Sequence, residues 1–312
     1  MKINTLALPF AISAALLLSA GSTTVLAAET KASASSSTKT KTATKPSSTK
    51  SVSKTKTAAA VGAAGLVGVT GIAAVAAVSQ TPELDALNAQ CAQQLASGSM
   101  PQAEETCVKA LTLAEKTAPK SKPLAMALSN QAALFSAKDM IPEAEESYKK
   151  ALTMYETALN PNHLAVATAL SQLAGFYFLH DRHAEAVPLY NRALSIDERA
   201  LGAEHPEVAK DLYNLATVNT LLGNYKDAEM QAQRSLQIRQ KVLKANDPAL
   251  VRTLDRMAEN FALQGRLDEA LRVYGLAVSA SEKAHGADAE ETRVCKAKFA
   301  NVQSQLSGGA TP

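Results

Sequence analysis

The sequence lacks the motifs that carry most enzymatic chemistry. It contains no glycine-rich phosphate loop, no serine nucleophile elbow and no helical HExxH pair of metal ligands. His180 and His183, with Glu185 nearby, lie at an expected hairpin tip without further ligands, so no metal site is expected there. The sequence therefore predicts a protein that is not an enzyme, uses no cofactor and no metal, and acts by binding.

Acidic residues and arginine are almost absent from the first 82 residues. This part contains eight lysines, no arginine and one acidic residue, Glu29, which gives a net charge of +7. Residues 83–312 contain 24 basic and 28 acidic residues, a net charge of −4, so the whole-chain value of +3 averages two unlike parts. Only the second part has the apolar periodicity that a folded core requires.

The first 28 residues have the pattern of a secretory signal peptide. Lys2 supplies the positive start, residues 6–18 form an apolar stretch, and Val25-Leu26-Ala27 is a small-residue cleavage site. The apolar stretch is too short to span a bilayer, and no cysteine lies near the cleavage site for a lipid anchor. We expect cleavage after Ala27 or Ala28 and export to the periplasm or the extracellular space.

Residues 29–57 consist almost entirely of serine, threonine, lysine and alanine. Such a segment buries too little apolar area to offset its ordering entropy, so it is predicted to be a disordered linker. Its lysines either attract an anionic surface such as phospholipid or serve as a solvated spacer. No aromatic residue is interleaved for base stacking, so nucleic acid is not an expected partner.

Residues 58–80 are rich in alanine, glycine and valine. The stretch 58–78 is uncharged and long enough to cross a membrane, which would give the chain a membrane contact through residues 31–78. A span here would return the later residues to the cytoplasm, which argues against insertion. The alternatives are oligomerisation through close glycine and alanine contacts, or a disordered stretch.

Apolar and small residues recur every 42 residues beyond residue 83. The period is clearest in three sets: Leu170, Leu212 and Leu254; Ala174, Ala216 and Ala258; and Ala186, Ala228 and Ala270. Within each unit, two helical apolar runs flank a polar break, which predicts an antiparallel helix hairpin. Small residues at the facing positions allow the helices to approach, and Tyr190 or Tyr274 fills the gap to the next unit. One hairpin cannot offset its own ordering entropy, so the hairpins must stack into an all-α solenoid.

One repeat unit is clearest at residues 205–243, which read HPEVAKDLYNLATVNTLLGNYKDAEMQAQRSLQIRQKVL. This unit resembles the tetratricopeptide repeat, in the long form found in kinesin light chains. Similar copies precede and follow them in one phase. The resemblance implies an α-solenoid with a concave face lined by the first helix of each pair. The expected hairpins and final cap helix are 83–119, 120–161, 162–203, 204–245, 246–286 and 288–306, within a solenoid at 83–306.

The resemblance also places candidate peptide-binding residues in the groove. They lie at two positions of each first helix, four residues apart and therefore on one helix face: Asn130, Gln172, Lys210, Asn214, Arg252 and Arg256. Asn214, Arg252 and Arg256 match part of the arrangement with which chaperone-binding repeats clamp a terminal carboxylate. Ser171 and Gly175 stand where that arrangement has lysine and asparagine. Asp255 and Glu259 could neutralise the arginines, so the alternative is a solvated charged face.

Cys91 and Cys107 lie on the two helices of the first expected hairpin, at similar distances from its turn. In an oxidising compartment this arrangement permits a disulfide, and the alternative is two small buried thiols. We expect Val294, Ala297 and Val302 to be the apolar points of the cap helix, and Cys295, alone among the cysteines on that helix, to be a core residue.

The sequence therefore predicts an exported, tethered scaffold that binds a peptide or partner protein along its groove at the cell envelope. The alternative is a self-assembling spacer protein that forms homo-oligomers through residues 58–80. The identity of a partner does not follow from the residues.

Overall fold

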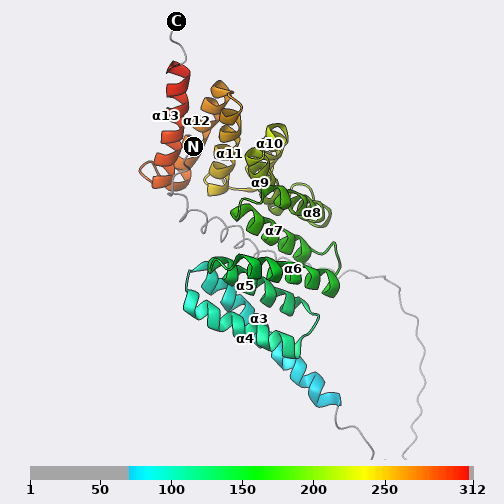
Figure 1. Ribbon diagram of the computed structural model, residues 1–312. Helices are drawn as coiled ribbons and strands as arrows, with labels where there is room; N and C mark the ends of the chain where they lie inside the picture. The colour runs from blue at the N-terminus through cyan, green and yellow to red at the C-terminus, as the bar shows by residue number, and fades with distance from the viewer. Residues whose placement is uncertain (1–69, 309–312) are drawn as a thin grey trace, which may run out of the picture.

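The computed structural model describes the backbone of residues 70–308 and the side chains of residues 82–308. Eleven helices and no strand occupy this range, and successive helix hairpins stack into a curved solenoid (Figure 1). The hairpins are α3–α4, α5–α6, α7–α8, α9–α10 and α11–α12, and α13 follows the last. The helices are α3 Thr70–Ala96, α4 Met100–Thr117, α5 Lys122–Ala137, α6 Ile141–Ala158, α7 Leu164–Leu179, α8 His183–Leu201, α9 Pro206–Leu221, α10 Tyr225–Val242, α11 Pro248–Leu263, α12 Leu267–His285 and α13 Glu290–Gly308. The expected all-α solenoid of five hairpins with a C-terminal helix is confirmed.

The first helix begins earlier than the expected hairpin boundary at residue 83. α3 starts at Thr70 and is 27 residues long, whereas its partner α4 has 18 residues. The alanine-rich sequence before Pro82 favours helix and extends α3 beyond the hairpin, so that its start projects from the stack in Figure 1. None of the helices between residues 70 and 308 combines the length and hydropathy that a bilayer crossing needs.

The expected signal peptide, the expected linker and residues 58–69 lie outside the described residues. Oligomerisation through residues 58–80 and contact of residues 31–78 with an anionic surface stay predictions.

Side-chain caps begin the first helices of the hairpins. His163, His205 and Asp247 stand one period apart, and each accepts a hydrogen bond from the backbone N–H two residues further on, at 3.0, 3.2 and 2.8 Å. Each cap satisfies an N–H group that the helix itself leaves unpaired.

The hairpin tips share one backbone geometry. The residue two positions before the start of each second helix has positive φ: 73° at Gly98, 60° at Asp139, 57° at Asp181, 77° at Gly223 and 73° at Gly265. This left-handed conformation ends a helix and costs glycine little, and aspartate tolerates it better than most residues. The same step of the repeat therefore accepts either glycine or aspartate.

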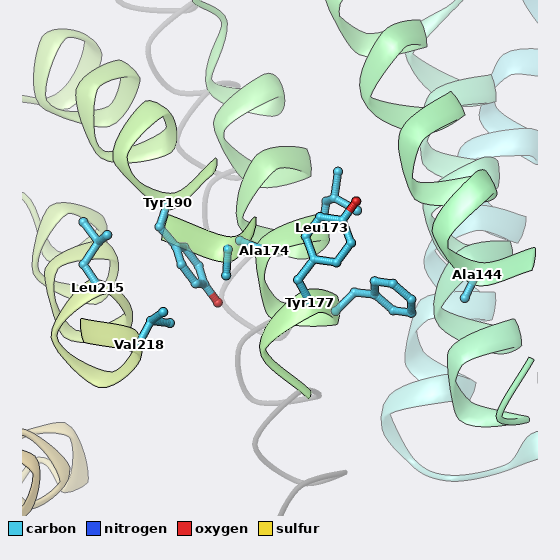
Figure 2. Close-up of a cluster of buried hydrophobic side chains, with 9 residues drawn as sticks. Ala144, Leu173, Ala174, Tyr177, Tyr190, Leu215 and Val218 are labelled. Carbon is cyan, nitrogen blue, oxygen red and sulfur yellow. The ribbon is translucent and has the colours of Figure 1, made fainter. Parts of the chain in front are cut away.

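The core runs between hairpins as well as within them. Ala174 and Ala186 are fully buried at the facing positions of α7 and α8, which lets the two helices pack closely. Tyr190 of α8 is 1 % exposed and points towards Leu215 and Val218 of α9, so it fills the gap to the following hairpin (Figure 2). The expected roles of the small residues and of Tyr190 are confirmed.

Two arginines, two periods apart, tie consecutive hairpins together. Arg182 lies 4.3 Å from the centre of the Tyr177 ring and pairs with both Glu145 of the preceding hairpin and Glu185. Glu145 also accepts a hydrogen bond from the Tyr177 hydroxyl, and the Arg182 guanidinium lowers the pKa of Glu145 to about 2. Arg266 repeats the arrangement over the Phe261 ring, with Glu229 and Glu269 as its carboxylates. The intervening hairpin has Asn219 and Asn224 at the equivalent positions and joins them by an amide hydrogen bond instead.

The cap helix packs through a different stripe from the one expected. Val302 is buried, but Val294 is 41 % exposed and Ala297 is exposed, so the expected apolar points are wrong at two of three positions. Thr292 and Cys295 are the buried residues in the first turns of α13. The Thr292 hydroxyl donates to the Gly286 carbonyl, which lets a polar residue lie at the core side of the helix.

Candidate peptide-binding surface

First helices of neighbouring hairpins contact one another, α3 with α5 and α9 with α11, while each second helix packs on the following first helix. The closer approach of the first helices places them on the inner side of the curve. We call the solvent-facing surface of α5, α7, α9 and α11 the inner face.

At the N-terminal end of the inner face, the candidate Asn130 serves the fold. Its side-chain amide donates to the Asn88 carbonyl at 2.9 Å, across one period. The fully buried Asn88 in turn donates to the Pro123 carbonyl at 3.0 Å. These two amides join α3 to α5, so the Asn130 amide N–H is already used inside the stack.

The other candidates differ strongly in their exposure. Gln172 is half-buried on α7, and Lys210 is half-buried on α9 and pairs with Glu207. Asn214 is only 4 % exposed. Arg256 keeps 20 % of its side chain exposed, its Nη1 lies 2.6 Å from Glu259, and its Nε is buried without a hydrogen-bond acceptor. Arg252 alone among the six is exposed.

The structure therefore brings Lys210, Asn214, Arg252 and Arg256 together on α9 and α11, and leaves Asn130 and Gln172 on earlier hairpins. Whether any of them contacts a partner stays a prediction.

A buried arginine that the sequence analysis missed lies behind this part of the inner face. Arg239, near the end of α10, is 6 % exposed. Its Nη1 donates to the Ala249 carbonyl at 2.8 Å and to the Thr253 hydroxyl at 2.6 Å, and its guanidinium lies 5.0 Å from the centre of the Tyr213 ring. Burial, and then the charge of Arg252, lower the pKa of Arg239 to about 10.

Arg239 and Arg252 differ from the charged residues around them because neither forms an ion pair with a carboxylate of residues 82–308. The neighbouring charges are paired: Lys210 with Glu207, Arg256 with Glu259, and Lys298 of α13 with Asp255 at 2.6 Å. Asp247 and Glu207 attract Arg239 only from a longer range. At the junction of α9, α10 and α11, Arg239 and Arg252 therefore carry positive charge without a bonded carboxylate. A carboxylate of another molecule could pair with Arg252, which is exposed.

A cleft of about 640 Å³ lies on the opposite side, between the second helices α4 and α6 with α5 as its floor. Its apolar lining includes Leu111, Leu124 and Leu128. The ammonium groups of Lys149 and Lys150 at its rim are paired with Glu145 and Glu146. Both basic side chains in the lining of this cleft are therefore paired, unlike Arg252 on the inner face.

Cys91 and Cys107 form a disulfide between α3 and α4, with their Cα atoms 5.2 Å apart. Cys295 is a free, buried cysteine on α13, as expected of a core residue. No group of three or more histidine, cysteine, aspartate or glutamate residues within the described part of the chain could hold a metal ion.

Comparisons with known proteins agree with this architecture. Residues 124–165 and 165–241 match two family models, each described as tetratricopeptide repeat. A comparison with curated proteins gives no match.

Solved structures with the same fold come from several sources. A Podosopora anserina putative kinesin light chain with nearly identical TPR-like repeats is 19 % identical with a TM-score of 0.57, over 65 % of this chain and 97 % of that one. The apo form of RapI is 15 % identical with a TM-score of 0.59, over 73 % of this chain and 81 % of that one. Pseudomonas aeruginosa PilF is 21 % identical with a TM-score of 0.50, over 74 % of this chain and 95 % of that one. At these identities the likeness shows the fold alone.

Proposed function

Since this chain is a tetratricopeptide repeat protein, we propose that it is a scaffold that binds an acidic peptide segment of a partner protein on the inner face at α9 and α11. Tetratricopeptide solenoids are typically protein–protein interaction scaffolds. The chain acts by binding in this proposal, and no residue is assigned a catalytic role.

The observation that carries the proposal is the pair of arginines without a carboxylate. A guanidinium that is removed from water loses hydration, and a buried charge is ordinarily compensated by an opposite charge and by hydrogen bonds. Arg239 has the hydrogen bonds but lacks the carboxylate, and Arg252 lies exposed on the adjoining helix. An aspartate or glutamate side chain of a bound segment would supply the missing charge.

The rest of the surface suits an extended chain rather than a small molecule. Leu221 and Leu263, one period apart at the ends of α9 and α11, are 50 % and 53 % exposed. Arg252 lies eleven residues before Leu263 on α11, which corresponds to about 16 Å along a helix. A segment with an acidic group and an apolar group at about this separation would engage both ends of the surface.

Arg252→Glu is expected to abolish selection of acidic peptides. The new carboxylate would lie beside Arg239 and occupy the place proposed for the partner's carboxylate. A random 12-residue peptide library selected on the full chain should be enriched in aspartate and glutamate. The selected peptides should bind Arg252→Glu at least about tenfold more weakly, a loss of about 1.4 kcal/mol.

The matched control is Arg272→Glu, which makes the same charge change at an exposed position of α12. It should bind the selected peptides as the unmodified chain does. Selection without acidic enrichment, or equal losses in the two variants, would contradict the proposal. Circular dichroism and thermal unfolding of both variants establish that the fold is kept.

The place of action is proposed from residues 1–28. Their pattern is that of a cleaved secretory signal, which would deliver the repeats to the periplasm or the extracellular space. Expression in a bacterial host, followed by N-terminal sequencing of the recovered protein, should give a chain that begins at Ala28 or Glu29. A recovered chain that still begins at Met1 would contradict export.

A further inference from the structure

Two carboxyl groups meet in the interior of the solenoid. Asp197, near the end of α8, is 8 % exposed, and Asp211 of α9 is 1 % exposed. The Ser171 hydroxyl of α7 donates to Asp211 Oδ1 at 3.3 Å. The second oxygen of Asp211 is buried and has no hydrogen-bond partner among the N–H and hydroxyl groups, and Asp211 lies against the carboxyl group of Asp197 across the junction.

A hydrogen bond between two carboxyl groups requires a proton on one of them. Two ionised carboxylates at this place would repel each other in a region from which water is largely excluded. Asp197 and Asp211 are therefore expected to share one proton. This proton joins α8 to α9 and contributes to the contact between the third and the fourth hairpin.

The surrounding charges do not supply an alternative partner. Glu207, in the first turn of α9, adds negative charge, and Lys210 attracts both carboxyls while it pairs with Glu207. Tyr190 of α8 lies near Asp211. From α10, Arg239 attracts Glu207 but directs its hydrogen bonds to α11. From α7, the group that bonds Asp211 is the neutral Ser171 hydroxyl.

We propose that Asp197 and Asp211 form a proton-dependent latch between the third and fourth hairpins, closed while they share a proton and loosened when both are ionised. Each hairpin contacts mainly its neighbours, so loosening at α8–α9 changes the angle between the two halves of the solenoid while the contacts within each half persist. This inference does not depend on which partner the inner face binds.

The direction of the pH dependence follows from burial. Burial is the main cause that raises the pKa of Asp197 to about 6. Burial, together with the negative charge of Asp197, raises the pKa of Asp211 well above its ordinary range. The folded junction therefore holds protons more tightly than the unfolded chain does, and its stability is greatest at low pH. Stability decreases as the pH rises above the ordinary aspartate pKa of 3.8, through the pKa of Asp197 at about 6 and then through the raised pKa of Asp211.

Hydrogen–deuterium exchange of the full chain between pH 5 and pH 9, corrected for the intrinsic exchange rate, tests the latch. Protection of the end of α8 and the start of α9 should fall at least about tenfold over this range, while protection of α11 and α12 changes little. Asp211→Asn keeps the side-chain volume, cannot ionise and can donate its amide N–H to Asp197. Its α8–α9 protection should be independent of pH.

Asp197→Asn provides an independent second variant and should give the same flat profile. Asp227→Asn, an exposed change in the first turn of α10, is the matched control and should keep the pH dependence of the unmodified chain. A flat profile in the unmodified chain, or an unchanged pH dependence in both Asp211→Asn and Asp197→Asn, would overturn the proposal. Because peptide selection by Arg252 is measured separately, its failure would leave this result unaffected.

Discussion

Tyr190→Ala is expected to lower the free energy of unfolding by about 3–5 kcal/mol, the loss typical of a buried aromatic side chain. Tyr190 is 1 % exposed and fills the space between its own hairpin and Leu215 and Val218 of the next one. The truncated side chain would leave a cavity at the junction of the two hairpins, which the rigid helices can fill only in part. Urea unfolding followed by circular dichroism measures the change.

Tyr225→Ala is the matched control for this effect. Tyr225 is half-exposed at the start of α10, so its side chain contributes less burial and its truncation should cost about 1 kcal/mol or less. In a stack of neighbour-dependent units, the Tyr190 variant should also broaden the unfolding transition, because the two halves lose their coupling. Equal losses in the two variants would contradict the packing described for this junction.

Reduction of the Cys91–Cys107 disulfide is expected to destabilise the first hairpin by about 3 kcal/mol, the value for a closed loop of similar length. The two cysteines are 16 residues apart and almost fully buried. Among residues 70–308, the first hairpin packs on one neighbouring hairpin, whereas the inner hairpins pack on two, so fewer contacts there compensate for the loss. Hydrogen exchange with and without reductant should show faster exchange in α3 and α4 and unchanged exchange in α9–α12.

A variant separates the disulfide from other effects of the reductant. Cys91→Ala with Cys107→Ala should reproduce the reduced state in the absence of reductant, and the protein carrying Cys295→Ala should still respond to reductant in α3–α4. Unchanged protection of α3 and α4 in the double variant would show that the disulfide does not support the first hairpin.

The repeat period allowed the helix hairpins to be predicted because the same packing or capping requirement recurs at the same position of each repeat. Ala174 and Ala186 must be small where two helices cross, and Tyr190 must be large where two hairpins meet. His163, His205 and Asp247 recur because each first helix needs an acceptor for its initial N–H groups. These demands are local, and the residues that meet them are recognisable in the sequence.

The charged interior was not predictable in the same way. Asp197 and Arg239 occupy the same step of consecutive repeats, and Tyr155 occupies it one repeat earlier. A position that holds tyrosine, aspartate and arginine in turn gives no sign of burial, because burial there depends on how closely successive hairpins approach. The same dependence explains the groove candidates: the approach of α9 to α11 buries Asn214, while Arg252, one turn before Arg256, remains in solvent.

Hydrogen exchange of the full chain with and without an acidic peptide from the library selection tests most directly whether α9 and α11 bind an acidic segment. The bound peptide should add protection in α9 and α11, and this added protection should be lost in the Arg252→Glu variant. Protection centred on the cleft between α4 and α6, or protection of α9 and α11 that persists in Arg252→Glu, would contradict an acidic-segment site at Arg239 and Arg252.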